Sequence, residues 1–161
     1  MVINETRVIP ARIYGARREK EEKIEMLLLK DLGDRKWEVL VKPGKKCQIG
    51  TELEFGRREG KNPLLVAKVV DIREDGNRIV ELNYDGILNS ILDEIGVMPL
   101  PPYIHEELKE KNRYQTIYAK YEGSAAAPTA GLHFTEDLFE ELKQKGVKIA
   151  KVTLHVGIGT F

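Results

Sequence analysis

The side chains best suited to acid–base chemistry near neutral pH are two histidines in unusual local sequences. His133 lies near the end of an uncharged run of mostly small residues, Ser124–Phe134, which reads SAAAPTAGLHF. Small residues let the backbone approach a ligand closely, and Gly131 can adopt torsions that other residues avoid. A helix expected after Thr135 would add unpaired N–H groups for an anion or a carboxylate. On spacing alone, a small-residue loop packed under a helix is the plainer interpretation.

His155 lies in a stretch near the end of the sequence that is expected to form a strand. Alternation places His155 and Thr153 on the face opposite the apolar side chains of that strand. A polar face followed by Gly157 and Gly159 can line a pocket or face solvent, and the pattern does not decide between the two. The glycine pair is not a nucleotide fingerprint, because the third glycine and the following helix are missing.

Other catalytic and metal-binding patterns are absent from the sequence. The three histidines lie in separate segments without a recognised ligand spacing, so no metal site is expected. Cys47 is the only cysteine, which excludes an intramolecular disulfide and fits a reducing cytoplasm. There is neither a nucleophile elbow nor a phosphate-binding Gly-Lys-Ser loop. His105, beside two glutamates, is interpreted as an exposed residue at the start of a helix.

The composition is that of a globular protein without a strong charge. The chain has 161 residues, of which 42% are hydrophobic and 32% charged, and its 26 basic and 26 acidic side chains cancel. A dedicated nucleic-acid-binding domain usually has a basic excess. RNA contacts are therefore expected only from a local patch, such as the arginines between Arg7 and Arg18, or from chain not present. No apolar run approaches the roughly 20 residues needed to cross a bilayer, and the N-terminus does not resemble a signal peptide.

Two halves with different patterns must position these residues. The first half predicts six short strands separated by turn residues, typical of a small β-barrel whose closure removes exposed edges. These strands are Arg7–Tyr14, Lys23–Leu29, Lys36–Lys42, Thr51–Phe55, Leu64–Ile72 and Arg78–Tyr84. The second half predicts three helices and a strand. They are a helix capped by Asp85 and running through Glu94, a helix over Lys111–Glu122, a helix capped by Thr135 that runs to Lys145, and a strand from Val152 to Ile158.

Several segments, taken as text, are more specific than any single residue. They are NETRVIPARIY at Asn4–Tyr14, GVMPLPPYI at Gly96–Ile104, Tyr114-Gln115-Thr116, AAPTAGLHF at Ala126–Phe134 and LHVGIGTF at Leu154–Phe161. In this order they closely resemble the S-adenosylmethionine:tRNA ribosyltransferase-isomerase family of queuosine biosynthesis. The resemblance runs from one end of the chain to the other.

The resemblance implies both an activity and a fold. The family transfers and isomerises the ribosyl part of S-adenosylmethionine onto 7-aminomethyl-7-deazaguanine at the tRNA wobble position, giving epoxyqueuosine and releasing adenine and methionine. S-adenosylmethionine is thus a co-substrate, no metal is expected, and the enzyme is expected to be a cytoplasmic monomer. The implied fold is α+β, with a six-stranded barrel (residues 12–96) inserted in an α/β domain formed by residues 1–11 and 97–161.

The resemblance also suggests roles for individual residues. We expect His133 to transfer a proton or orient the substrate, while Thr129 and the Gly131 backbone hold the ribosyl donor. His155 and Thr160 would line the same pocket from the strand, and Arg7 would bind an RNA phosphate or the donor carboxylate. The remaining expected ligand-binding residues are Pro128, Phe134, Gly157 and Gly159.

Family members are considerably longer than this chain, so the sequence is expected to be a fragment that does not catalyse the reaction unaided. Three alternatives remain beside the enzymatic interpretation. The chain can be a stand-alone RNA-binding barrel or a non-catalytic fragment. The third, a methyltransferase that uses the same cofactor, is disfavoured because no strand–GxG–helix element precedes an acidic ribose-binding residue.

Overall fold

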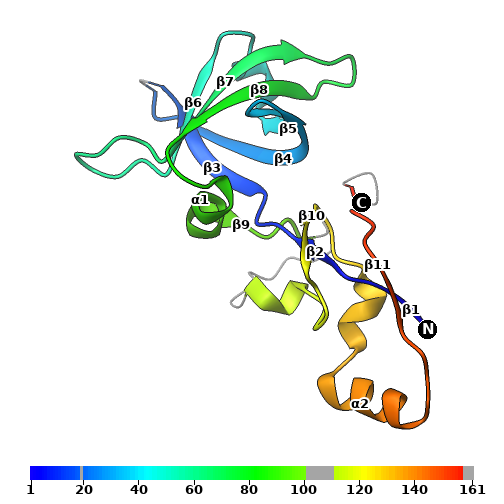
Figure 1. The fold of residues 1–161 in the computed structure, drawn as a ribbon. Helices are drawn as coiled ribbons and strands as arrows, with labels where there is room; N and C mark the ends of the chain where they lie inside the picture. The colour runs from blue at the N-terminus through cyan, green and yellow to red at the C-terminus, as the bar shows by residue number, and fades with distance from the viewer. Residues whose placement is uncertain (19, 101–110, 158–161) are drawn as a thin grey trace. The chain divides into compact units, whose positions relative to one another are not determined.

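The computed structural model describes residues 1–18, 20–100 and 111–157. The chain divides into two compact units: Pro10–Val97, and Met1–Ile9 together with Met98–Phe161. The first unit is thus inserted in sequence between the two segments of the second (Figure 1).

The unit Pro10–Val97 is a closed antiparallel barrel. Its six strands are β3 (Arg12–Arg17), β4 (Lys23–Gly33), β5 (Lys36–Lys42), β6 (Glu52–Phe55), β7 (Leu65–Ile72) and β8 (Arg78–Tyr84). They are ordered β4-β5-β8-β7-β6-β3, and the pairing of β3 with β4 closes the ring. The predicted six-stranded barrel is therefore confirmed.

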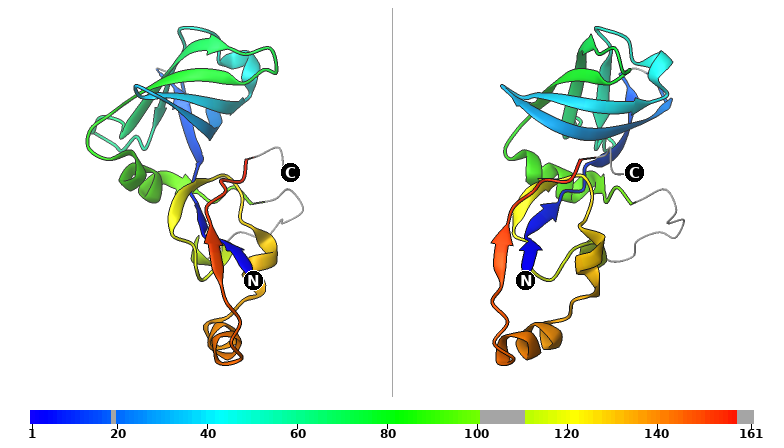
Figure 2. Two further views of the ribbon diagram at one scale, coloured as in Figure 1. Left: turned by 45° about the vertical axis from the view of Figure 1, so that its right-hand side comes forward. Right: turned by 90° about the vertical axis from the view of Figure 1, so that its right-hand side faces the viewer.

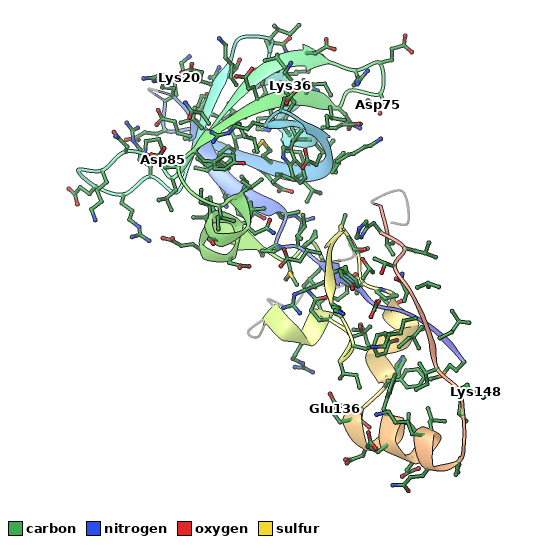
Figure 3. The ribbon with its side chains drawn as sticks, viewed as in Figure 1. Lys20, Lys36, Asp75, Asp85, Glu136 and Lys148 are labelled. Atoms are coloured by element: carbon green, nitrogen blue, oxygen red, sulfur yellow. The ribbon has the colours of Figure 1, made fainter. Side chains whose placement is uncertain are left out.

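The barrel core follows from the period-two pattern of its strands. The largest fully buried side chains of this unit are Phe55, Ile13, Ile24, Met26, Leu28, Leu53, Leu65, Leu82, Leu92, Val39 and Val69. Burying one such side chain contributes about 1.5–3 kcal/mol to stability. Charged side chains on the connections, including Lys20 and Asp75, point away from the barrel (Figure 3). In β6, Glu54 is also buried, and Arg18 and Arg57 lie within ion-pair distance of its carboxylate, at 3.6 and 3.4 Å.

A short helix, α1 (Leu88–Ile95), follows the barrel and leads into β9 (Gly96–Val97), which pairs with β3. The prediction that Asp85 caps this helix is wrong, because the cap position is Ile87 and no side chain caps the helix there. Gly86 adopts a left-handed conformation with φ of 83°, which interrupts the helical path between Asp85 and Leu88. The helix ends at Ile95, one residue beyond the predicted Glu94, with Gly96 at the C-cap position.

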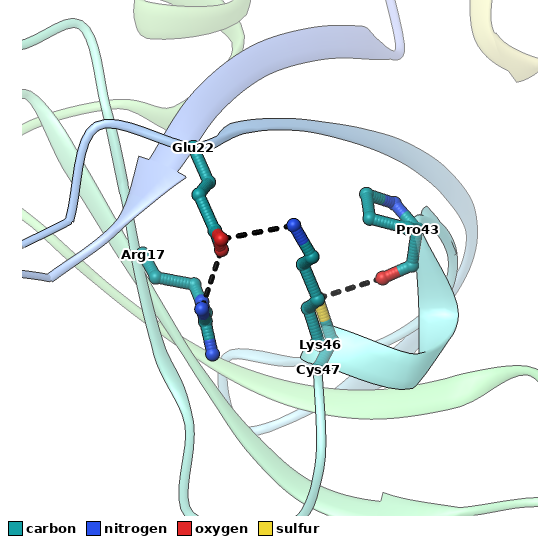
Figure 4. Close-up of polar contacts among 5 residues, drawn as sticks. All are labelled: Arg17, Glu22, Pro43, Lys46 and Cys47. Atoms are coloured by element: carbon teal, nitrogen blue, oxygen red, sulfur yellow. Dashed lines mark hydrogen bonds and ion pairs between the residues drawn. The ribbon is translucent and has the colours of Figure 1, made fainter.

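One end of the barrel holds an ion cluster around Glu22 (Figure 4). The carboxylate of Glu22 accepts a hydrogen bond from Lys46 Nζ at 2.9 Å and a second from Arg17. Lys46 belongs to the 3₁₀ turn η1 (Gly44–Lys46). The hydrogen bond from Lys46, followed by that from Arg17, lowers the pKa of Glu22. Next to this cluster the buried thiol of Cys47 donates to the carbonyl oxygen of Pro43 at 3.7 Å.

The second unit contains two parallel strand pairs. Strand β1 (Val2–Asn4) pairs with β11 (Ala150–Val152), and β2 (Thr6–Val8) pairs with β10 (Tyr121–Ser124). Both views of Figure 2 show β11 running beside β1. Glu5 joins the pairs: its N–H donates to Val152 O at 2.9 Å, and its carbonyl accepts from Lys120 N at 2.8 Å and Tyr121 N at 3.2 Å.

Helix α2 (Glu136–Gln144) forms as predicted. Its cap residue, Thr135, accepts a hydrogen bond from Leu138 N through Oγ1 at 3.2 Å, and two acidic residues occupy the first turn. Phe139 is the buried residue of the helix and packs with Tyr118 and Phe134, at ring-centroid distances of 5.3 and 5.4 Å. Together with the barrel and the parallel strand pairs, this helix gives the predicted α+β fold.

Three predicted elements differ from the structure. Arg7–Tyr14 is not one strand, because β2 ends at Val8 and β3 begins at Arg12, with Pro10, which lacks a donor N–H, between them. The predicted helix over Lys111–Glu122 is wrong: that stretch contains the 3₁₀ turn η2 (Lys111–Tyr114) and the start of β10, because pairing with β2 overrides the local pattern.

The predicted strand from Val152 to Ile158 is also largely wrong. β11 ends at Val152, and Leu154, expected on its inner face, is 65% exposed. The physical reason is that its partner β1 ends at Asn4. Ile158 lies outside the described residues. In the described ranges, no helix has the length and apolar character needed to span a membrane.

Candidate functional site

The motifs that stood apart in the sequence meet in the second unit, and Asn4 makes the first of these connections. Its side-chain Oδ1 accepts from Leu154 N at 3.0 Å, and its Nδ2 donates to Leu154 O at 2.9 Å. The same Oδ1 accepts from Thr6 N at 3.2 Å. The side chain of Asn4 therefore replaces strand pairing just beyond the end of β11 and joins the NETRVIPARIY segment to the LHVGIGTF segment.

A chain of side-chain hydrogen bonds makes the second connection. Thr6 Oγ1 lies 2.7 Å from Ser124 Oγ and 3.0 Å from His155 Nδ1. Ser124 Oγ also accepts from Val156 N at 2.8 Å, and Ala125 N donates to Val156 O at 2.9 Å. Thr6 and Ser124 are fully buried, whereas His155 is exposed. These contacts bring the start of SAAAPTAGLHF against the LHVGIGTF segment.

The His155 ring packs directly on the backbone of Gly123. A Cβ atom at Gly123 would lie 2.7 Å from Cε1 and 2.9 Å from both ring nitrogens, closer than real Cβ atoms come. Gly123 also has φ of 141°, a conformation that side chains rarely adopt. Glycine at this position therefore leaves the space in which the imidazole sits.

The Tyr114-Gln115-Thr116 motif packs against the small-residue segment through Tyr114. Tyr114 Oη accepts a hydrogen bond from Ala127 N at 3.3 Å. Tyr114 and Ala127 share a buried cluster with Val8 and Met98. Met98 belongs to the GVMPLPPYI segment, so four sequence motifs contribute to one core.

Gly131 is packed as tightly as Gly123. A Cβ atom there would lie 2.2 Å from Tyr118 Oη and 2.8 Å from Thr116 Cγ2. Thr116 is buried, and its Oγ1 has no hydrogen-bond partner in the part of the chain that the structure describes. The small-residue segment therefore lets its backbone pack closely, as the sequence predicted, but its observed contacts are with the protein's own side chains.

The structure places the other predicted site residues as follows. Thr129 and His133 are exposed residues at the two ends of the 3₁₀ turn η3 (Thr129–His133), and Pro128 precedes it. Phe134 packs against both Tyr118 and Phe139. At Gly157, no atom of the described ranges lies within 4 Å of an added Cβ. Gly159 and Thr160 lie outside the described residues.

Arg7 lies in the middle of β2 and is partly buried. It makes no ion pair with any residue of the described ranges. Nearby, Glu5 is buried and its carboxylate lies 3.7 Å from Lys151 Nζ. No cluster of three His, Cys, Asp or Glu side chains suited to a metal ion occurs among the residues described.

Sequence reasoning assigned no role to Asn4, Thr6, Gly123 or Ser124. Asn4 and Thr6 belong to the NETRVIPARIY motif, and nothing in the sequence around them predicts a contact with Leu154 or His155. Their partners are 150 and 149 residues away in the sequence. The available signal was that small polar residues accompany each motif, which fits side-chain capping of irregular backbone.

A groove of about 720 Å³ lies on the barrel, and the sequence did not predict it. Its lining includes the cations Arg18, Arg57 and Lys61, and the carboxylates Glu52, Glu54 and Asp85. Because the two signs balance, this groove is not the basic patch expected of an RNA-binding barrel.

Comparison with known proteins is consistent from end to end of the chain. A family model described as "Queuosine biosynthesis protein" matches residues 1–161. The S-adenosylmethionine:tRNA ribosyltransferase-isomerases of Clostridioides difficile (strain 630) and Finegoldia magna are 57% and 58% identical over the whole chain, which covers 46% and 45% of them. A solved structure, S-adenosylmethionine tRNA ribosyltransferase from Thermotoga maritima, is 34% identical, with 96% of this chain and 40% of that chain covered and a TM-score of 0.42. The chain spans about half the length of the curated relatives it matches, and it belongs to the queuosine biosynthesis protein family.

Proposed function

We propose that this chain forms one wall of the active site of an S-adenosylmethionine:tRNA ribosyltransferase-isomerase. The observation that carries the proposal is the meeting of the NETRVIPARIY, SAAAPTAGLHF and LHVGIGTF segments at Asn4, Thr6, Ser124 and His155. Relatives at 54–58% identity are named for this activity. Since the chain spans about half their length, the activity is proposed for a protein of the relatives' full length.

The proposed substrates are S-adenosylmethionine and a cytoplasmic tRNA that carries 7-aminomethyl-7-deazaguanine at the wobble position. The amine of the modified base would attack the ribosyl donor, and adenine and methionine would leave. Acid–base groups are needed because protons move when the amine is alkylated and the adenine departs. The enzyme is proposed to act as a monomer and without a metal ion.

Within this proposal, His133 and Thr129 act from the exposed turn η3, where their side chains are accessible to a ligand. His155 acts from the LHVGIGTF segment, where its ring is held by a hydrogen bond with Thr6. The Gly131 backbone, Pro128, Phe134 and Gly157 shape the donor pocket, with Gly159 and Thr160 beyond it. Arg7 is proposed to bind phosphate or the donor carboxylate, since it has no carboxylate partner among the residues described.

The test is a chimera of this chain with the remaining segments of the Clostridioides difficile relative. We expect adenine release from S-adenosylmethionine only when tRNA carrying the modified base is present, with a ribosyl-derived mass added to the tRNA. A methyl-sized mass increase would identify a methyltransferase instead. Tight tRNA binding with no response to S-adenosylmethionine would support a non-catalytic RNA-binding role.

A single substitution tests the leading residue. His133→Ala in the chimera is expected to lower the rate of adenine release by about 10²–10⁴-fold, the range of general acid–base catalysis. Lys145→Ala, an exposed position next to α2, is the control and should leave the rate unchanged. Undiminished turnover in His133→Ala would remove His133 from the mechanism.

A further inference from the structure

We propose that Ser124 and Thr6 form a directed hydroxyl chain that holds His155 with its proton on Nε2. His155 would then present a fixed N–H donor to an oxygen acceptor of a ligand, instead of abstracting a proton. This inference rests on the proposed function for the identity of the ligand. The direction of the chain follows from the hydrogen bonds and the burial of Ser124, independently of the ligand.

The hydrogen bonds of Ser124 fix the direction in which its hydroxyl donates. A serine hydroxyl has one proton to donate and two lone pairs that accept. Ser124 Oγ accepts from Val156 N at 2.8 Å, and its other partner in the described ranges is Thr6 Oγ1 at 2.7 Å. Because Ser124 is fully buried, its proton must go to Thr6.

The direction of the Thr6 hydroxyl follows from that of Ser124. Thr6 Oγ1 accepts from Ser124, so its own proton points to its remaining partner, Nδ1 of His155, at 3.0 Å. A neutral imidazole carries one proton, and the hydrogen bond made by one nitrogen sets the site of that proton. With Nδ1 as the acceptor, the proton lies on Nε2.

The opposite direction leaves a buried donor without an acceptor. If Nδ1–H donated to Thr6, Thr6 would donate to Ser124, whose oxygen would then accept twice. The hydroxyl proton of Ser124 would be buried with no acceptor among the described residues, which costs its full desolvation penalty. The chain therefore selects one tautomer.

The Nε2 atom of His155 is accessible to a ligand. His155 is an exposed residue, and its Nε2 has no hydrogen-bond partner in the described part of the chain. The ring is fixed on one side by Gly123, whose missing Cβ leaves room for it, and at Nδ1 by Thr6. A fixed N–H donor suits a carboxylate, a ribose hydroxyl or a phosphate oxygen, all of which the proposed substrates carry. Thr6 and Ser124 are then positioning residues for His155.

The direct test is the tautomer of His155 in this 161-residue chain, which requires no activity. Long-range ¹H–¹⁵N spectra of histidine-labelled protein at about pH 8, where imidazole is ordinarily neutral, should show Nδ1 unprotonated and Nε2 protonated, with no detectable Nδ1–H form. A His155→Gln sample assigns the signals. A protonated Nδ1, or the averaged signals of an unrestrained ring, would overturn the proposal.

Variants test the chain itself. Ser124→Ala and Thr6→Val should each allow a detectable Nδ1–H population at His155, whereas Thr6→Ser keeps the hydroxyl and should preserve the single tautomer. Unchanged tautomers in both folded disrupting variants would contradict the directed chain. If neither variant folds, the wild-type spectrum still decides the proposal.

The role of the donor is tested separately in the active chimera. Removal of a hydrogen-bond donor to a reacting ligand lowers rates by about 10²–10³-fold, which we expect for His155→Ala. His155→Gln supplies an amide N–H near the position of Nε2 and should retain at least about ten times more activity than His155→Ala. Equal losses in both variants would contradict the donor role. An inactive chimera would count against the proposed function, but the tautomer measurement would stand.

Discussion

The side chain of Gln115 forms hydrogen bonds with both the backbone N–H and the backbone C=O of Val8. Its side-chain Oε1 accepts from Val8 N at 3.0 Å, and its Nε2 donates to Val8 O at 2.6 Å. Val8 ends β2, two residues after Thr6, and its side chain lies in the core with Tyr114. The Gln115 side chain thus supplies the hydrogen bonds that a neighbouring strand would make at the end of β2. It thereby helps hold Thr6 in place.

Gln115→Glu should destabilise the chain by about 1–3 kcal/mol, because the carboxylate cannot donate to Val8 O and leaves that carbonyl unsatisfied. Chemical denaturation measures the loss, and amide hydrogen exchange at Val8 should accelerate. Gln144→Glu, at an exposed position at the end of α2, is the matched control and should change stability little. An unchanged exchange rate at Val8 would show that the glutamine does not bind the strand.

Gly131→Ala should destabilise the second unit by about 1–3 kcal/mol through overpacking, since the added Cβ meets Tyr118 Oη at 2.2 Å. Tyr118→Phe removes the hydroxyl that the added Cβ meets, so the double variant should recover part of the loss, while the contact with Thr116 Cγ2 at 2.8 Å remains. Gly157→Ala, whose added methyl has no described atom within 4 Å, serves as the control. Thermal unfolding of the wild type, the two single variants and the double variant gives a double-mutant cycle, with Gly157→Ala measured alongside. Additive effects of the two substitutions on stability would contradict a steric clash between the added Cβ and the Tyr118 hydroxyl.

The barrel was predictable from the sequence because its information is local. Most of its strands alternate buried and exposed residues, although β4 and β6 each contain three consecutive buried residues. Its connections carry their own turn residues. In the turn before β8, Asn77 N donates to Asp75 Oδ1 at 3.0 Å and Gly76 has φ of 87°, as that sequence predicts. The cap at Thr135 was predictable for the same reason.

The second unit was harder to predict because its structure depends on distant partners. Lys111–Glu122 has helical spacing of its tyrosines, yet Tyr121 pairs with Thr6 and Gln115 with Val8, which is 107 residues away. The motifs located the region of the candidate site but not its connections. The chain Ser124–Thr6–His155 spans contacts of 118 and 149 residues, which no local pattern encodes. The roles of His133 and Thr129 stay predictions.

Cys47 should react slowly with thiol reagents in the native protein. The side chain is fully buried and donates to Pro43 O, and burial raises the pKa of its thiol. Labelling requires a local opening, so it should be roughly 100-fold or more slower than labelling of Ser90→Cys, an exposed position on α1, in a Cys47→Ala background. In urea, where both proteins are unfolded, the labelling rates of Cys47 and of the cysteine at position 90 should match. Equal native rates would contradict the burial of Cys47.

The raised pKa of the Cys47 thiol also predicts a loss of stability in alkali. Above about pH 8.5, the ordinary thiol pKa, the unfolded chain releases the proton while the folded chain retains it, so the unfolded state gains. The free energy of unfolding should therefore fall less steeply with rising pH in Cys47→Ala than in the wild type. Parallel curves in the two proteins would contradict the raised pKa.

Glu22 should contribute stability that disappears in acid. Hydrogen bonds from Lys46 and then Arg17 lower the pKa of its carboxyl in the folded protein, so the folded state favours the charged form. That contribution is fully present above the ordinary glutamate pKa of about 4.3 and is lost as the pH falls through the lower folded value. Glu22→Gln should therefore be less stable than the wild type near pH 7, and the difference should shrink below about pH 4.

Urea denaturation between neutral and acid pH measures this difference. Glu21→Gln is the matched control, because Glu21 is exposed and makes no contact with Lys46 or Arg17. Added salt should reduce the effect of Glu22→Gln, since the pair lies near the surface and is screened. A difference between Glu22→Gln and wild type that stays constant from pH 7 to pH 3 would mean that the glutamine acts through packing and not through the charge on Glu22.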